Sequence, residues 1–228
     1  MTRQMGLPLA AAPSHARADF RVSGANALAL RAVEGWAGWP QGKLALVGPE
    51  GSGKTHLAQI WAAEADAEVI PGAGLTGADL PALAARGRVA VEDAAGVAGD
   101  GAAERALLHL HNMVLAEGGR LLLTAETPPA RWPVALPDLA SRLAATATAM
   151  LHPPDDALLA AVLAKQFADR QVTVPPGLIE WLVRRMERSL GAARDLVERI
   201  DAKALTERRA ITQKLAAEVL DSPPPDRR

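Results

Sequence analysis

The chain has no cysteine and no tyrosine among its 228 residues, and it has only 2 phenylalanines and 5 tryptophans. The absence of cysteine excludes disulfide frameworks, zinc sites built from thiolates and cysteine nucleophiles. Because aromatic residues make up 3% of the chain, it has little material for stacking nucleic-acid bases. The net charge of -1 lacks the basic excess of dedicated nucleic-acid-binding proteins, so we expect no specific DNA binding by the chain itself.

Long hydrophobic runs are missing as well. No apolar segment is long enough to span a bilayer, so we expect no association with a membrane. Residues 1–4 lack the apolar segment of a secretion signal, which favours a soluble, cytoplasmic protein. Hydrophobic residues make up 49% of the chain and charged residues 22%, as in ordinary globular proteins. A chain of this length can bury a large core without metals or disulfides.

Strand and helix patterns alternate in the first two thirds of the chain. Short apolar runs predict five strands, at residues 43–47, 68–70, 89–91, 121–124 and 149–151. Between them, apolar residues follow helical spacing in segments 57–64 and 107–115. Strands that alternate with helices typically form a parallel sheet covered on both faces. The sequence therefore predicts an α/β fold with a five-stranded parallel sheet.

After residue 152 the pattern is helical only. Acidic and proline residues that favour helix starts, together with apolar spacing, predict four helices at about 156–170, 175–188, 191–205 and 211–220. These patterns divide the chain into a flexible arm (1–18), an α/β domain (19–152), a small all-helical domain (153–220) and a disordered tail (221–228).

A glycine-rich loop follows the first predicted strand. Residues 48–55 fit the pattern G-x-x-x-x-G-K-[ST] between a strand and a helix. Glycines allow backbone N–H groups to surround phosphates, and the helix N-terminus adds its dipole. The pattern predicts that Lys54 contacts the β- and γ-phosphates and that the Thr55 hydroxyl binds Mg²⁺. The alternative is a glycine turn without a ligand. The loop residues assigned to nucleotide binding are Gly48, Gly51, Ser52, Gly53, Lys54 and Thr55.

Two acidic residues end the third predicted strand. Glu92 and Asp93 stand where P-loop ATPases carry one acid for Mg²⁺ and a second that polarises water, so we assign Glu92 to the metal and Asp93 to catalysis. The usual order is Asp before Glu, and the exchange changes the reach of each acid by one methylene. Because reactive geometry tolerates little displacement, we expect metal-assisted binding with weak intrinsic ATP hydrolysis. A solvated acidic turn is the alternative interpretation.

Several segments resemble AAA+ proteins of the DnaA type, and together they cover residues 19 to 205. Residues 19–26 resemble the segment that lies beside the adenine, and residues 53–57 match the family around the loop lysine. Residues 123–129 look like the end of the sensor 1 strand. Residues 138–143 are similar to the box that carries the arginine finger, and residues 191–196 to the sensor 2 helix of the lid.

The resemblance implies an AAA+ P-loop NTPase with a helical lid, ADP or ATP as the cofactor, and Mg²⁺. It implies that Glu126, where the initiator usually has Asp, takes part in catalysis. It also implies that Arg142 is an arginine finger that acts in trans on a partner's nucleotide. The further nucleotide-binding residues that it implies are Asp19, Phe20, Val22, Asn26, His56 and Arg194.

The arm carries a motif of its own. Residues 4–9 are similar to the motif by which proteins dock on the replicative sliding clamp, where glutamine fills a polar subsite and apolar residues fill a groove. An arm without a partner is the alternative interpretation. The residues assigned to clamp binding are Gln4, Met5, Leu7, Pro8 and Leu9.

Two features favour a regulatory branch of this family. One is the clamp motif, and the other is that no DNA-reading helix-turn-helix follows the lid-like region. The implied partners are the sliding clamp (the β subunit of DNA polymerase) and the initiator DnaA, whose ATP hydrolysis the chain would stimulate, so that replication initiation is negatively regulated. Self-association stays open. Two alternatives are an autonomous AAA+ ATPase of the helicase-loader type and a truncated DNA-binding initiator.

Overall fold

The computed structural model describes residue 17 and residues 20–222. Five strands form one sheet in which each neighbouring pair is parallel, in the order β2-β3-β4-β1-β5. Their bounds are β1 (Lys43–Val47), β2 (Glu68–Pro71), β3 (Arg88–Glu92), β4 (Arg120–Ala125) and β5 (Ala147–Met150). The predicted α/β fold with a five-stranded parallel sheet is therefore confirmed.

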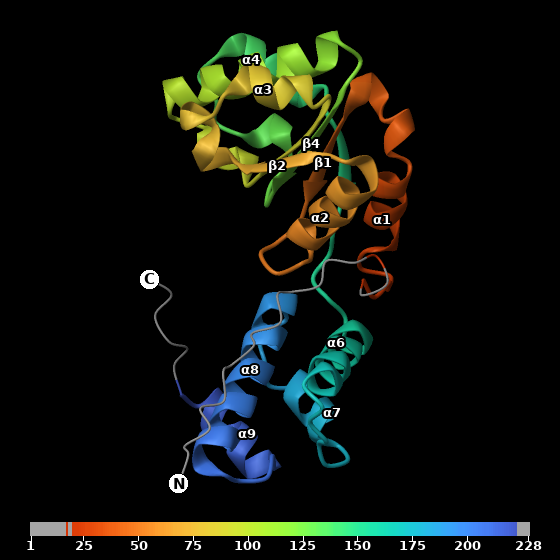
Figure 1. Cartoon of the computed structure of the whole chain (residues 1–228), viewed down its shortest axis with the longest axis vertical. Coiled ribbons are helices and arrows are strands. Elements are labelled where there is room, and N and C mark those ends of the chain that lie inside the picture. Colours follow the sequence, from red (N-terminus) through yellow and green to blue (C-terminus); the bar gives the residue numbers. More distant parts are fainter. Residues whose placement is uncertain (1–16, 18–19, 223–228) are drawn as a thin grey trace, which may run out of the picture.

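Helices cover both faces of the sheet (Figure 1). On one face of the sheet lie α1 (Ala27–Glu34) and α2 (Lys54–Ala65). On the other face lie α4 (Gly101–Ala116) and α5 (Pro137–Ala144), and α3 (Leu80–Ala85) packs against α4. Because side chains alternate along a strand, Leu44 and Leu46 of β1 join the first cluster, whereas Ala45 and Val47 join the second. β1 is buried along its whole length. This central strand therefore fixes the position of the glycine-rich loop that follows it.

Short 3-10 helices complete the α/β lobe. They lie in the turns that lead into or out of the strands and helices. Their bounds are Trp36–Gly38, Pro40–Gly42, Gly72–Gly77, Ala94–Val97 and Pro129–Arg131.

The remaining helices form a second lobe with a hydrophobic cluster of its own (Figure 1). Phe167 and Leu196 are among the side chains buried there. The side chains of Asp155, Ser189 and Thr212 each accept a hydrogen bond from a backbone N–H in the first turn of a helix, as N-terminal caps do. The bounds of these helices are α6 (Asp156–Asp169), α7 (Leu178–Val183), α8 (Leu190–Glu207) and α9 (Gln213–Leu220).

One helix of this lobe is shorter than the sequence predicts. A helix was expected over 175–188, but α7 covers only Leu178–Val183. Gly177 has a φ of +79°, a left-handed conformation that interrupts any helix begun at the prolines. Among the described residues, no helix combines the length and apolar character needed to cross a membrane.

Candidate functional site

The glycine-rich loop connects β1 to α2 and leaves backbone donors open. Gly51 and Gly53 have φ values of +68° and +103°, which glycine adopts without strain. Gly53 is the N-cap residue of α2 and supplies no side-chain cap, so the first N–H groups of this helix have no side-chain acceptor there. Ser52 Oγ is buried and has no hydrogen-bond partner among the described residues. The loop therefore offers backbone donors suited to phosphate oxygens.

Lys54 points back into this loop. Its side chain is 8% exposed, and Nζ donates to the carbonyl oxygens of Gly48 at 2.8 Å and Pro49 at 2.9 Å. Burial lowers the pKa of Lys54, while the negative charges of Glu126, Asp93 and Glu50 oppose that shift. The structure thus brings the loop lysine within electrostatic reach of the two acids that the sequence assigned to catalysis.

The acids come from two neighbouring strands. Asp93 follows β3 with a φ of +49°, and its backbone N–H donates to Thr124 Oγ1 on β4 at 3.0 Å. Glu126 follows β4 and is exposed. Because β4 lies between β1 and β3, its end separates the loop from the Glu92–Asp93 pair. The carboxyl ends of three strands therefore supply one site.

The site fits a nucleotide with Mg²⁺. Glu92 Oε1 is buried without a hydrogen-bond partner in the described chain, and the Thr55 side chain is exposed at the start of α2. No group of three His, Asp or Glu side chains forms a metal site by itself among residues 17 and 20–222. A cation here would thus take Glu92, Thr55, waters and phosphate oxygens as ligands, as Mg²⁺ does at phosphate sites.

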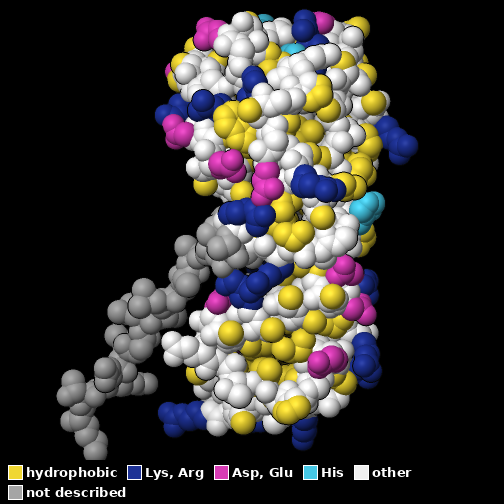
Figure 2. Space-filling view, turned by 90° about the vertical axis from the view of Figure 1, so that its right-hand side faces the viewer, with side chains coloured by type: hydrophobic (Ala, Val, Ile, Leu, Met, Phe, Trp, Pro, Cys, Tyr) yellow, Lys and Arg dark blue, Asp and Glu magenta, His cyan; other side chains and the backbone are white. Residues whose placement is uncertain are grey.

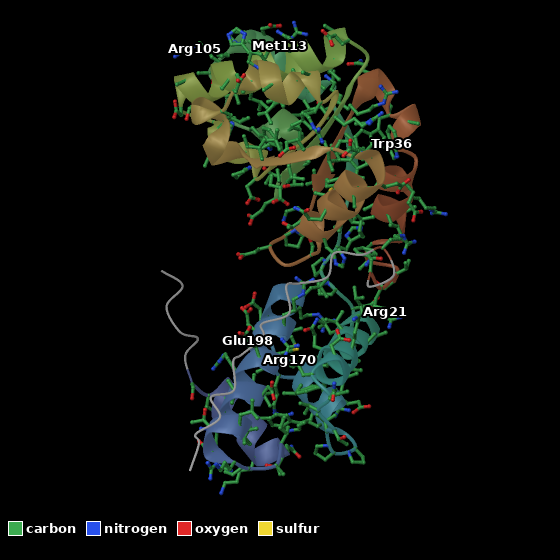
Figure 3. All side chains as sticks on the ribbon, viewed as in Figure 1. Arg21, Trp36, Arg105, Met113, Arg170 and Glu198 are labelled. Atoms are coloured by element: carbon green, nitrogen blue, oxygen red, sulfur yellow. The ribbon has the colours of Figure 1, made fainter. Side chains whose placement is uncertain are left out.

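The segment before α1 lies at the junction of the two lobes, where Figure 3 places Arg21. Phe20 contacts His56 of α2 edge to face, with ring centroids 5.2 Å apart. Asn26 is 2% exposed and holds the turn, because Nδ2 donates to the Arg21 carbonyl and Oδ1 accepts from the Ser23 N–H, both at 2.9 Å. Val22 is 54% exposed. Of the residues expected to bind the nucleotide, Asp19 alone lies outside the described residues.

The helical lobe touches the loop directly. The backbone N–H of Leu190 donates to the Gly51 carbonyl at 2.9 Å. A Cβ atom at Gly51 would lie 1.9 Å from Ser189 Oγ, so only glycine fits there without displacing the lobe. Arg194 lies one turn further along α8 and is half-buried. On the face shown in Figure 2, Lys and Arg side chains gather where the two lobes meet.

Arg142 lies at the opposite end of the sheet. Its backbone carbonyl accepts a hydrogen bond at 2.7 Å from Lys43 Nζ, and Lys43 begins β1, whereas the loop follows Val47. Four rises of about 3.3 Å separate Lys43 from Val47, so the two ends of β1 lie about 13 Å apart. The Arg142 guanidinium is paired with Asp138, with Nε 3.1 Å from Oδ1, and this pair is partly exposed. Arg142 therefore cannot reach the phosphates of its own loop.

Sequence reasoning missed the buried charge of Glu104. Glu104 of α4 is 0% exposed, and its carboxylate accepts hydrogen bonds from the backbone N–H groups of Gly99, Ala135 and Leu136, each at 3.0 Å. These bonds lower the pKa of Glu104, the bond from Ala135 most. Leu136 is the N-cap residue of α5, so Glu104 fixes the start of the helix that carries Arg142. The sequence signal was its place on the apolar face of α4, three residues before Leu107.

No known protein-family model matches the chain. Among solved structures, domain III of the replication initiation protein DnaA from Thermotoga maritima is similar, with a TM-score of 0.77 and 19% identity over 92% of this chain and 96% of that one. The fold is that of a DnaA-type AAA+ domain. AMPPCP-bound DnaA from Aquifex aeolicus superposes with a TM-score of 0.69 and 16% identity, covering 86% of this chain and 67% of that one.

The same AAA+ fold occurs beyond DnaA. The FIGL-1 AAA domain in complex with ADP has a TM-score of 0.64 and 14% identity, over 88% of this chain and 79% of that one. The AAA+ fold places the glycine-rich loop, the ends of β3 and β4, and the helical lobe around one position.

Proposed function

We propose that the chain is an adenine-nucleotide-dependent regulator that resembles Hda, the factor that inactivates DnaA. It binds ADP or ATP at the loop, with Lys54 against the phosphates. The nucleotide-bound DnaA and FIGL-1 structures of the same fold support an adenine nucleotide as the ligand. Mg²⁺, when bound, neutralises phosphate charge, while Thr55 and Glu92 hold it.

The remaining assigned residues surround this ligand. Phe20 packs edge to face on His56 of α2, and Val22 supplies an exposed apolar surface for the base. Asn26 contributes by holding the turn that carries Val22. Arg194 of α8 senses the phosphates from the helical lobe, which already contacts Gly51.

The observation that carries the regulatory proposal is the separation of Arg142 from its own site. An arginine at the amino-terminal end of β1, with the length of that strand between it and the loop, suits a partner's nucleotide. Its ion pair with Asp138 is partly exposed, and such pairs contribute little, so the guanidinium can exchange Asp138 for a phosphoryl group. There it would stabilise the negative charge that develops during transfer, as arginine fingers do.

The arm completes the proposal. Gln4, Met5, Leu7, Pro8 and Leu9 lie outside the described residues, and we propose that they dock on the sliding clamp. The clamp then brings Arg142 to DnaA on DNA, and hydrolysis of the initiator's ATP switches initiation off.

The test measures ATP hydrolysis by DnaA in the presence of the DNA-loaded clamp and this protein. Arg142→Ala should reduce the stimulation by about 10³-fold, the lower range for a finger acting in trans, and Arg142→Lys should restore little because an ammonium lacks the planar fork. Arg105→Ala is the control, since Arg105 is exposed on α4 at the end of the molecule far from the lid lobe (Figure 3). Full stimulation by Arg142→Ala would refute the assignment.

A second variant tests the arm separately. Alanine at Gln4, Met5 and Leu7 should remove clamp binding while the thermal stabilisation by ADP stays unchanged. Normal clamp binding by this variant would remove the arm from the proposal.

An autonomous ATPase of the helicase-loader type is the second candidate. The negative charges of Glu126 and Asp93 both oppose the lowering of the Lys54 pKa by burial, so the two acids assigned to catalysis lie near the loop lysine in one site. Turnover by the protein alone separates the two. Hydrolysis at about the enzyme median of 10 s⁻¹ without partners would favour the loader.

A further inference from the structure

A second polar site lies at the amino-terminal end of β1, opposite the glycine-rich loop. The structure contains there a cavity of about 540 Å³. Its polar lining combines two cations, an imidazole, two amides and a hydroxyl, and three apolar residues complete the wall. The polar lining residues are Gln41, Lys43, His111, Asn112, Ser141 and Arg142. A cavity of this size is in the range that small organic ligands occupy.

Lys43 is the central group of this cavity. It is 2% exposed, although it carries an ammonium group that is costly to bury. Nζ donates to the Arg142 carbonyl at 2.7 Å and lies 3.3 Å from His111 Nε2. The Lys43 ammonium has three N–H donors and two partners among the described residues, so one donor remains for a ligand. No carboxylate pairs with Lys43 among the residues described, so its charge is not neutralised by the protein.

His111 extends the site from the buried face of α4. It is 5% exposed, and Nδ1 lies 3.2 Å from Asn112 Oδ1. Burial lowers its pKa most, and the charges of Lys43 on β1 and Arg142 on α5 lower it further, against Asp138 on α5 and the hydrogen bond to Asn112. This lowered pKa favours the neutral imidazole, and an anion in the cavity would favour protonation of His111.

The backbone of the rim is strained. Gln41 has a φ of +53°, and left-handed backbone at a residue other than glycine persists only where the surroundings hold it. This conformation places Gln41 at the cavity, where its amide adds a donor. Such strain clusters at ligand sites in folded proteins.

We propose that this cavity binds the phosphoryl group of a small molecule through Lys43, His111 and Arg142. Lys43 supplies a positive charge without a carboxylate partner among the described residues, and Arg142 supplies a second when it exchanges Asp138 for the phosphoryl group. The amide and hydroxyl groups match the additional oxygens of that group. The site shares Arg142 with the proposed regulation of DnaA, but Lys43 and His111 have no part in that regulation, so the cavity goes beyond it and can be tested without any partner.

The experiment titrates the full chain with inorganic phosphate by calorimetry, and citrate serves as a carboxylate probe. Because the glycine-rich loop is itself proposed to bind phosphates, ADP is added first to occupy it. Lys43→Met, which alters only this cavity, should then abolish the phosphate binding that the wild type shows. Lys214→Met, at an exposed lysine of α9, is the matched control. Phosphate binding by Lys43→Met equal to that of the wild type would overturn the proposal. Binding of citrate without phosphate, or of neither, would overturn it as well.

The pH dependence gives a second readout that does not rely on Lys43→Met folding. Relative to His111→Gln, phosphate binding by the wild type should strengthen by about threefold to tenfold between about pH 8 and pH 6. The protonation of phosphate itself is common to both proteins, and one unit of pKa change in His111 corresponds to tenfold. His111→Gln preserves an acceptor for Lys43 and should lose most of this dependence. The histidine resonances should show one pKa that rises when phosphate is added. A dependence unchanged in His111→Gln would refute the role of His111 and with it the proposed site.

Discussion

Replacement of Glu104 by Gln tests whether one buried carboxylate holds the start of α5. The carboxylate accepts from three backbone N–H groups, whereas an amide has only one oxygen and directs its NH₂ group at a donor. A hydrogen bond to a charged group contributes about 1.5–3 kcal/mol, so the loss of up to two of them predicts a destabilisation of about 3 kcal/mol. For a chain of this size that corresponds to a melting temperature lower by about 6–12 °C.

The assay is urea unfolding followed by circular dichroism over a range of pH. Because the pKa of Glu104 is lowered in the folded state, its stabilisation is complete above the unfolded carboxyl value of about 4.3 and is lost as the pH falls through the folded value. The difference between wild type and Glu104→Gln should therefore be constant near neutral pH and shrink in acid. Glu117→Gln, at an exposed position at the end of the same helix, is the control and should change little. A cost below about 0.5 kcal/mol, or one equal at both ends of the pH range, would refute the reasoning.

Three further outcomes are expected. Lys54→Ala should lose the ADP-dependent rise in melting temperature, which for the wild type corresponds to about 2.7 kcal/mol at a hundredfold excess over Kd, and Lys214→Ala should keep it. The protein alone should hydrolyse ATP far more slowly than about 10 s⁻¹ in a phosphate-release assay, because Glu92 and Asp93 reverse the usual order of the acids. Gly51→Ala should weaken ADP binding by displacing Ser189, which a binding titration would show, whereas Gly77→Ala, with nothing within 4 Å of its added Cβ, should leave binding unchanged.

Local patterns made the sheet and the loop predictable. The run from Lys43 to Val47 lies between glycines at 42 and 48, and the predicted strand has the bounds that the structure shows. The loop motif depends on consecutive residues, so its place between β1 and α2 also followed from the sequence. The start of α7 did not, because it depends on the left-handed backbone of Gly177.

The buried charges were not predictable in the same way. The partners of Glu104 are backbone N–H groups, two of them 31 and 32 residues further along the chain. Every residue except proline carries such a group, so the sequence does not indicate which of them will donate to Glu104. Lys43 was expected as a strand residue, but its ammonium meets a carbonyl 99 residues away. Only the packing of α4 and α5 on the sheet brings these groups together, and no local pattern describes that packing.

The strand order has a consequence for synthesis on the ribosome. The central strand β1 pairs with β4 on one side and β5 on the other, so both of its edges need residues made much later. About a hundred residues separate β1 from the end of β5, which takes about 5–20 s at usual translation rates. During that interval the apolar segment of β1 is unpaired because β4 and β5 have not both been synthesised, and non-local parallel pairing is slow to form. The nascent chain should therefore depend on chaperones until β5 has emerged.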